Sequence, residues 1–266
     1  MGLAIEVRNL VKRFGDHEAV AGISFAVEEG EVFGLLGPNG AGKTTTIRIL
    51  ATLLPPTAGQ IKVEGIDCSR QGALVRRLIG YVPQVLSADS SLTGYENLLF
   101  LAKLLRIPKR EREQRIREIL TLLNLQEAAS RLVRQYSGGM VRRLEIGQAI
   151  LHRPRVLILD EPTVGLDPVA RHTVWKALEL LREETGLTIL ITTHYMEEAE
   201  ALCRRVAIMD RGRIAVQGTP AELKARTGNP QATLEDVFTY FTGSQMESGG
   251  SFREMRQVRR RVQRFN

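Results

Sequence analysis

Hydrophobic residues along this chain fall into two alternating patterns. Short apolar runs, which are typical of buried strands, are followed by longer stretches in which apolar residues recur with helical spacing. The expected strands begin with the region around Ile5, Val7 and Leu10 and continue at 32–36, 60–63, 79–82, 156–159, 187–192, 206–209 and 213–216. The expected helices cover 44–53, 94–106, 109–124, 137–152, 168–184 and 234–241. This alternation predicts an α/β protein.

The middle third of the chain interrupts the alternation. Three expected helices follow one another there with no strand between them, and Pro154 ends the last of them. The strand at 156–159 then restores the alternating order, and the last two strands form a hairpin around Gly212. We therefore expect a helical insertion within an α/β domain.

The clearest chemical signal lies between the strand at 32–36 and the helix that follows it. The segment fits the pattern GxxxxGK[ST]. Its residues are Gly37, Pro38, Asn39, Gly40, Ala41, Gly42, Lys43 and Thr44, and Thr45 follows. Glycines let the backbone N–H groups and the helix N-terminus face phosphate. Lys43 supplies a positive charge and Thr44 a hydroxyl ligand for Mg²⁺. Against the alternative of a plain glycine-rich turn, this context predicts a grip on the triphosphate of ATP.

Two acids end the apolar run at 156–159. A carboxylate at the carboxyl end of a strand lies beside the phosphate loop in sheets of this type. Asp160 can then hold Mg²⁺, and Glu161 can polarise the attacking water as a general base. Without the phosphate loop, the same pair would be read as solvated acids after a core strand.

A third phosphate-directed element opens the helix predicted at 137–152. Ser137 precedes Gly138 and Gly139, which is an ordinary helix cap and also a good anion site. With this segment, the chain resembles the nucleotide-binding subunit of an ATP-binding cassette (ABC) transporter, in which the serine and glycines form the signature motif. Tyr136 and Met140 depart from the common LSGGQ form, whereas the Ser-Gly-Gly centre is intact.

Four further positions match the family in the expected order. The resemblance implies that Phe14 stacks on adenine and that Gln84 reaches the metal ion and reports to the membrane partner. It implies that Asp167 belongs to a loop at the dimer interface and that His194 senses the γ-phosphate. Taken alone, Phe14 would equally be a core residue and His194 a structural histidine.

The resemblance also implies an architecture and partners. It covers about residues 4–242 and implies a P-loop NTPase fold of the ABC type, with a mixed sheet core, an N-terminal antiparallel β part and a helical subdomain at about 86–155. The stretches at 193–200 and 233–238 are similar to ABC-2 type exporters of the daunorubicin-resistance kind. The family works as a homodimer, or as a heterodimer with a second ATPase subunit, around two ATP with Mg²⁺. It powers an ABC-2 type permease from the cytoplasmic face of the membrane, here for export of a drug-like or lipid-like compound.

Composition narrows the alternatives. The chain has 43% hydrophobic and 25% charged residues, which is ordinary for a globular protein. No apolar stretch of about 18 residues suggests a transmembrane helix, and the N-terminus does not resemble a secretory signal. The two cysteines have no metal-binding or paired spacing, so free thiols are favoured over a disulfide or metal site.

The positive charge is concentrated near the C-terminus. The formal charge is +7, and residues 251–266 hold six arginines and one glutamate, a net +5, so the other residues carry only +2. No nucleic-acid partner is therefore expected. Residues 243–266 are expected to form a flexible spacer and a basic amphipathic tail, which either contacts anionic lipid or is solvated or packed on its own domain.

Two other function classes remain as alternatives. A soluble ABC ATPase acting on nucleic acid or ribosomes usually has two cassettes or a long coiled-coil insert, whereas this chain has one cassette and a short helical insert. A P-loop kinase would not need the Ser137–Gly139 motif or His194 at these places. The lead interpretation is a transport ATPase.

Overall fold

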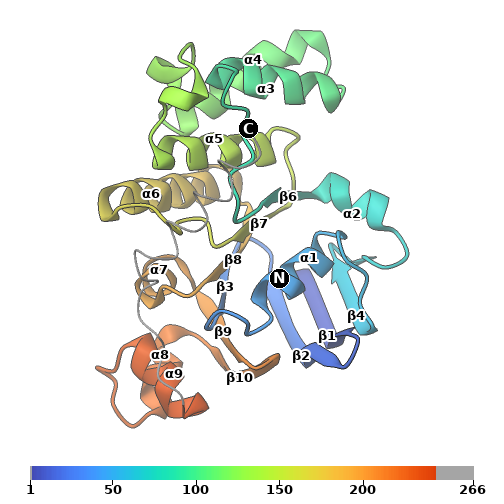
Figure 1. Cartoon of the computed structure of the whole chain (residues 1–266), viewed down its shortest axis with the longest axis vertical. Helices are drawn as coiled ribbons and strands as arrows, with labels where there is room; N and C mark the ends of the chain where they lie inside the picture. The colour runs from blue at the N-terminus through green and yellow to red at the C-terminus, as the bar shows by residue number, and fades with distance from the viewer. Residues whose placement is uncertain (1, 244–266) are drawn as a thin grey trace.

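A computed structural model describes residues 2–243 of the chain. The predicted spacer and basic tail lie outside these residues, apart from their first glycine. The described part forms two β-sheets that share a core, with a group of helices at one end (Figure 1). Within residues 2–243, none of the helices combines the length and the apolar character needed to cross a membrane.

The larger sheet has six strands in the order β10-β9-β3-β8-β7-β6. In chain order they are β3 (Val32–Leu36), β6 (Ile79–Val82), β7 (Val156–Asp160), β8 (Thr188–Thr193), β9 (Arg205–Asp210) and β10 (Arg213–Gly218). All neighbours pair in parallel except β9 and β10, which form an antiparallel hairpin. Every residue of β3, β7 and β8 is buried, as expected for central parallel strands covered on both faces.

The smaller sheet is antiparallel and has the order β2-β1-β4-β5. Its strands are β1 (Leu3–Phe14), β2 (His17–Glu28), β4 (Ala58–Val63) and β5 (Ile66–Asp67). Phe25 of β2 stacks on Phe33 of β3 with the ring centroids 5.5 Å apart, so the two sheets share one apolar layer. The predicted mixed sheet with an antiparallel N-terminal part is confirmed.

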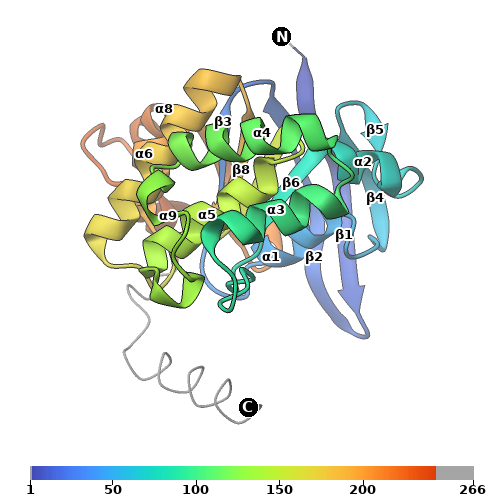
Figure 2. The same ribbon diagram turned by 90° about the horizontal axis from the view of Figure 1, so that it is seen from above.

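Nine α-helices and two short 3₁₀ helices complete the described part. The α-helices are α1 (Lys43–Leu50), α2 (Gly72–Leu78), α3 (Gly94–Leu104), α4 (Lys109–Leu122), α5 (Gly138–Ile150), α6 (Pro168–Thr185), α7 (Met196–Leu202), α8 (Pro220–Arg226) and α9 (Leu234–Thr242), and the 3₁₀ helices are Gln126–Ala128 and Val133–Gln135. Helices α3, α4 and α5 gather at one end (Figures 1 and 2), where α5 packs against both α6 and β6. The boundary of a subdomain at about 86–155 stays a prediction.

Helix α1 ends earlier than its sequence suggests. It stops at Leu50, before the two prolines that were expected to end it. Thr52 adopts a left-handed φ of 60°, its N–H bonds to Ile49 O at 3.0 Å, and Leu53 N–H bonds back to Arg48 O at 2.8 Å. This pair of hydrogen bonds is a Schellman motif, in which the left-handed residue is usually glycine. Because threonine occupies that position here, the sequence contains no glycine to mark the end of the helix.

The short helices α2, α7 and α8 were not predicted, because seven residues give too few turns for a clear apolar period. A cap signal was nevertheless present for α8. Thr219 and Glu222 form a reciprocal capping box, and Pro220 occupies the first turn.

We expect both cysteines to resist alkylation in the folded protein. Cys68 and Cys203 are free thiols and are buried, 6% and 7% exposed. Burial raises the pKa of Cys68 to about 12 and raises that of Cys203 as well, which lowers the reactive thiolate fraction by on the order of 10³ relative to an ordinary thiol. Alkylation followed by mass spectrometry should label two sites in unfolded protein and neither in native protein over the same time. A Ser130→Cys variant provides an exposed control thiol; wild-type labelling as fast as that control would contradict the prediction.

Candidate nucleotide site

The predicted phosphate loop joins the end of β3 to the start of α1. Gly40 and Gly42 have left-handed φ values of 82° and 100°, and a side chain at Gly42 would collide with the carbonyl oxygen of Ala19 on β2. Gly42 caps α1 without any side-chain hydrogen bond, so the first backbone N–H groups of the helix keep their capacity for an anion. The loop thus has the conformation that its sequence predicts.

Lys43 lies buried at the centre of this loop. Its ammonium donates to the carbonyl oxygens of Gly37 at 2.7 Å and Pro38 at 3.1 Å. The same nitrogen is 3.3 Å from Glu161 Oε1, and both side chains are about nineteen-twentieths buried. Burial lowers the pKa of Lys43, and the charge of Glu161 opposes that shift. The Lys43 ammonium is thus held at the phosphate loop by two backbone carbonyls and one carboxylate.

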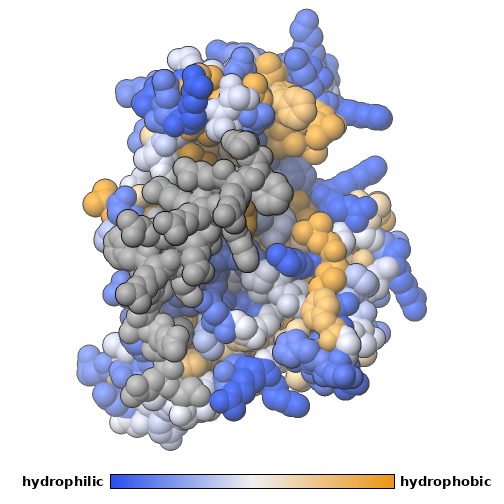
Figure 3. All heavy atoms as spheres, in the orientation of Figure 1, coloured by the Kyte–Doolittle hydropathy of each residue, from blue (hydrophilic) through white to orange (hydrophobic). Residues whose placement is uncertain are grey.

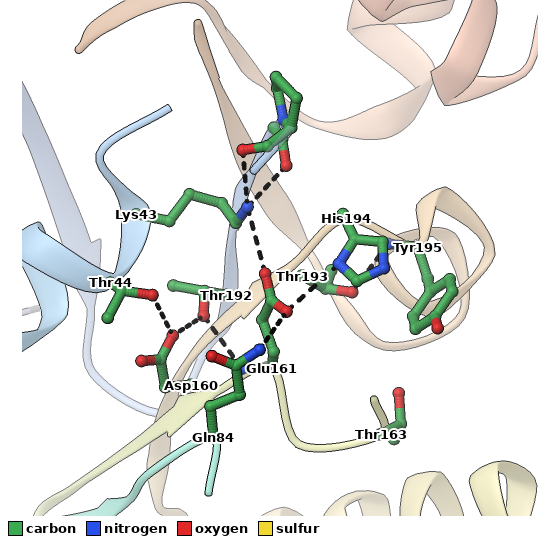
Figure 4. A network of polar contacts seen from close by, with 12 residues as sticks. Lys43, Thr44, Gln84, Asp160, Glu161, Thr163, Thr192, Thr193, His194 and Tyr195 are labelled. Carbon is green, nitrogen blue, oxygen red and sulfur yellow. Dashed lines mark hydrogen bonds and ion pairs between the residues drawn. The ribbon is translucent and has the colours of Figure 1, made fainter. Parts of the chain in front are cut away.

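Glu161 connects the loop to two other predicted residues. Its Oε2 accepts from Gln84 Nε2 at 3.2 Å and lies 3.3 Å from His194 Nδ1 (Figure 4). Burial raises the pKa of Glu161, but the contact with His194 and the charge of Lys43 together outweigh burial, and the pKa falls below its ordinary value. The side chain is therefore an ionised carboxylate at neutral pH, as a general base must be.

The backbone of Glu161 is also unusual. Its φ of 48° is left-handed, although the residue is not glycine. The N–H of Glu161 is held by both oxygens of Thr192 on β8, the carbonyl at 3.0 Å and the hydroxyl at 3.1 Å. These bonds keep the turn after β7 in a sparsely populated conformation that directs the carboxylate toward the phosphate loop.

Asp160, the last residue of β7, is paired with hydroxyl groups. Its Oδ1 accepts from Thr44 Oγ1 at 3.1 Å and from Thr192 Oγ1 at 2.7 Å. Burial raises the pKa of Asp160, and the two hydroxyl donors oppose the shift. A hydroxyl and a carboxylate in contact form the start of an oxygen donor set of the kind that Mg²⁺ prefers.

No cluster of three or more histidine, cysteine or acidic side chains is placed to hold a metal ion within residues 2–243. Mg²⁺ in nucleotide sites takes one or two protein oxygens, with substrate phosphates and water as its other ligands. The Thr44–Asp160 pair fits that usage, and a self-contained protein cage is not required.

The predicted signature residues lie elsewhere. Ser137 caps α5 by accepting from Met140 N–H at 3.3 Å, and both Ser137 and Gly138 are exposed. The two glycines pack against the start of α6, because added Cβ atoms would meet Leu166 and Ala170. This helix start therefore presents its backbone to the surface, beside the beginning of α6.

Two other predicted residues are exposed. Asp167 caps α6 by accepting from Ala170 N–H at 2.9 Å, so its carboxylate has a structural role whatever else it contacts. Phe14 is the last residue of β1 and is 48% exposed, with the Lys12 ammonium 5.0 Å from its ring centroid. Phe14 is thus not a core residue. Thr45 is half-buried in the first turn of α1.

A buried acid that the sequence analysis missed lies behind the site. Glu198 of α7 is fully buried and accepts from Thr163 Oγ1 at 2.8 Å and from the indole nitrogen of Trp175 at 2.9 Å. Burial raises the pKa of Glu198, and hydroxyl donors including Thr193 oppose it. Thr163 follows Glu161 by two residues and Thr193 precedes His194, so Glu198 supports two segments of the site. No helix was predicted for this segment, and nothing in its sequence indicated that one of its acids is buried.

Comparisons with known proteins identify the family of the chain. Residues 20–164 match the family model described as ABC transporter. The chain is 42% identical over 224 residues to the linearmycin resistance ATP-binding protein LnrL of Bacillus subtilis, covering 84% of this chain and 72% of that protein. It is 45% identical to the daunorubicin resistance ATP-binding protein DrrA3 of Streptomyces coeruleorubidus, covering 85% and 71%. It is 43% identical to a Nod factor export ATP-binding protein I of a Rhizobium species, covering 90% and 81%.

Solved structures show the same fold. The ATP binding subunit of an ABC transporter superposes with a TM-score of 0.78 at 30% identity, covering 90% of this chain and 99% of that one. A dimeric post-hydrolysis state of an ATP-binding cassette with ADP and Pi superposes with a TM-score of 0.71 at 28% identity, covering 81% and 98%.

The fold and the site define a P-loop ATPase, and the chain belongs to the ABC transporter family. It is an ATP-binding and ATP-hydrolysing subunit of the export type, as the resemblance implied.

We expect Glu161 to stabilise the fold in a pH-dependent way. Because the folded-state pKa is lowered, its contribution is present above the ordinary pKa and is lost as pH falls through the folded value. The difference in unfolding free energy between wild type and Glu161→Gln, measured by urea titration without nucleotide, should be largest near pH 7 and shrink below about pH 4. Exposed Glu197→Gln serves as the control. A difference for Glu161→Gln that does not vary with pH would overturn this assignment.

Proposed function

We propose that the chain binds ATP through residues 37–45 and hydrolyses it with Glu161 as the general base. The observation that carries this proposal is the position of Glu161, which lies buried within 3.3 Å of Lys43, Gln84 and His194. When the phosphates of ATP bind Lys43, its ammonium is shared between them and Glu161. The Glu161 carboxylate then lies on the side of the loop where the γ-phosphate binds. His194 then orients the carboxylate and senses the phosphate, and Phe14 offers an exposed ring for adenine.

Mg²⁺ is the second ligand that we propose. Thr44, Asp160 and Gln84 would hold it with the phosphates, and the first two are already in hydrogen-bond contact. When bound, the ion neutralises negative charge that develops on the phosphates during hydrolysis.

A dimer completes the site in this proposal. Ser137 and Gly138 are exposed at the helix start that they form with the buried Gly139, so on a second subunit this helix start can approach the ATP held by residues 37–45. A two-fold arrangement would enclose two ATP, with Asp167 near the interface. The likeness to a cassette solved as a dimer with ADP and Pi supports this arrangement. The partner is a second copy or a second ATPase subunit.

The proposed membrane partner is a separate ABC-2 type permease, which would hold the protein at the cytoplasmic face of the membrane. An exposed group of apolar residues, here named the apolar docking surface, offers the contact; it comprises Val85, Leu86, Phe100, Leu104 and Leu105. Hydrophobic side chains are visible over the helical end of the molecule (Figure 3). Asn97 of α3 exchanges hydrogen bonds with the backbone of Asp89, so the loop and α3 are held together. The resistance and export names of the relatives favour a drug-like or lipid-like cargo.

Changing Glu161→Gln should separate binding from hydrolysis. The amide keeps the shape but cannot accept the proton of water, so kcat should fall about 10²- to 10⁴-fold while the Kd for ATP stays near that of wild type. The variant should form a dimer with ATP in light-scattering measurements.

Two controls accompany this test. Lys43→Ala should have a lower affinity for ATP. Lys103 is exposed, so Lys103→Ala should bind ATP with wild-type affinity. Hydrolysis by Glu161→Gln at the wild-type rate would remove Glu161 from the role of base.

Polar changes on the apolar docking surface should weaken contact with the permease. Val85→Ser combined with Leu104→Ser removes two exposed side chains, 77% and 68% exposed, and should reduce capture of the co-expressed permease from detergent extracts about tenfold or more. Leu180→Ser on α6, which is 41% exposed, is the matched control. Equal capture by the double variant and by the control would exclude this surface.

A further inference from the structure

Two buried charged side chains of α5 hold the loop that carries Gln84. Arg142 and Glu145 lie one helical turn apart and form an ion pair, with Nη1 3.0 Å from Oε2 and both side chains 2% exposed. Arg142 Nη1 also donates to the carbonyl oxygen of Pro83 at 2.7 Å, and its Nη2 donates to that of Gln84 at 2.9 Å.

Glu145 binds the other end of the same loop. Its Oε1 accepts from the backbone N–H and the hydroxyl of Ser87, the latter at 3.2 Å, and from Ala88 N–H at 3.3 Å. Residues 83–88 are therefore attached to α5 at both ends. The two residues between the attachments, Val85 and Leu86, are exposed.

A buried ion pair is a weak source of net stability, because desolvation costs about as much as the attraction returns. Apolar side chains of similar volume would fill this space at comparable stability. The contribution of the pair is to fix the conformation of the loop. The two charged side chains bind four backbone groups of residues 83–88, and the planar guanidinium sets the distance between two of the carbonyl oxygens.

The attached elements are those that the proposed function uses. Helix α5 is capped by the signature serine, Ser137. The loop that α5 holds places the Gln84 amide on Glu161 and the side chains of Val85 and Leu86 on the apolar docking surface. One short network thus connects the signature, the hydrolytic carboxylate and the proposed permease contact.

We propose that Arg142 and Glu145 are positioning residues that make α5 and the Gln84 loop move as one unit. This proposal rests on the proposed function, in which the signature approaches ATP on a second subunit. When that contact shifts α5, the Arg142–Glu145 pair carries residues 83–88 with it. Because Gln84 already contacts Glu161 in the single subunit, any shift of α5 is passed on to that contact, and the rate of ATP hydrolysis then responds to engagement of the signature.

The same helix provides a matched control. Arg143 is 8% exposed and also donates to backbone oxygens, but its partners are Leu123 at 2.7 Å, Asn124 at 3.1 Å and Gly139 at 3.4 Å. It fastens α5 to the end of α4, and in the described part of the chain it donates no hydrogen bond to residues 83–88. Replacing Arg143 therefore removes a comparable buried arginine without cutting the proposed connection.

The experiment compares Arg142→Met, Glu145→Gln and Arg143→Met in the full chain. For each variant, kcat and KM for ATP are measured per folded molecule, together with the Kd of ATP and the thermal midpoint. We expect Arg142→Met to lower kcat about 10- to 100-fold with the Kd of ATP within about twofold of wild type. Glu145→Gln, which keeps an acceptor oxygen, should lower kcat less, and Arg142→Lys should restore part of it.

Hydrogen exchange gives a second measure. The amides of Ser87 and Ala88 should exchange faster in Glu145→Gln than in wild type, and at wild-type rates in Arg143→Met. If Arg142→Met and Arg143→Met lower kcat equally, or if Arg142→Met keeps full kcat, the positioning role is wrong. If Arg142→Met does not fold, a wild-type kcat in Glu145→Gln overturns the proposal and a lowered kcat with unchanged Kd supports it.

Glu161→Gln tests the proposed function separately from the coupling through α5. Hydrolysis that persists in Glu161→Gln would mean that the proposed function is wrong. An inactive Glu161→Gln beside a fully active Arg142→Met would mean that only the coupling through α5 is wrong.

Discussion

Lys43 and Glu161 form a pair of opposite charges that is almost completely withdrawn from water, and the architecture around them serves to keep the pair satisfied. An ammonium and a carboxylate buried in this way each need compensation, since either one alone would be strongly destabilising. Two carbonyl oxygens of the phosphate loop accept hydrogen bonds from Lys43. Glu161 accepts a hydrogen bond from Gln84 and is in contact with His194. The strands β3, β7 and β8 must therefore end at one edge of the sheet, because each supplies or precedes a member of this group.

The same constraint explains the turn after β7. Glu161 reaches Lys43 only because its backbone turns into the left-handed region, and Thr192 on the neighbouring strand holds that turn by its carbonyl and hydroxyl oxygens. The Thr192 hydroxyl in turn donates to Asp160. One threonine of β8 thus fixes both acids, and the parallel register that pairs Asp160 with Thr192 makes this possible.

Sequence patterns identified the parts of the site that carry their own local signature. The phosphate loop, Asp160 and Glu161 fall at strand ends or in a recognisable motif, Gln84 was implied by the family resemblance, and the structure brings them together. Residues whose role depends on distant partners carried no such signal. Arg142 and Glu145 act on a loop 58 or 59 positions away for most of their bonds, and periodicity along one helix does not reveal that contact.

Glu198 was missed for a related physical reason. An acidic heptapeptide helix reads as solvent-facing, and only the tertiary fold shows that one of its acids is buried against Trp175 and Thr163. The end of α1 was misplaced because threonine adopts the closing left-handed conformation there. Tertiary packing decided the first outcome, and a local backbone closure made by threonine decided the second.

Trp175 gives this molecule an optical property. It is the only tryptophan in the chain, and its indole N–H shares the Glu198 oxygen that also accepts from Thr163, in the segment between Glu161 and Asp167. Indole emission depends on nearby charge and on hydrogen bonding. A rearrangement of that segment therefore changes the surroundings of the only indole, so the unmodified chain reports on residues 161–167 by intrinsic tryptophan fluorescence, with no added dye and no second tryptophan.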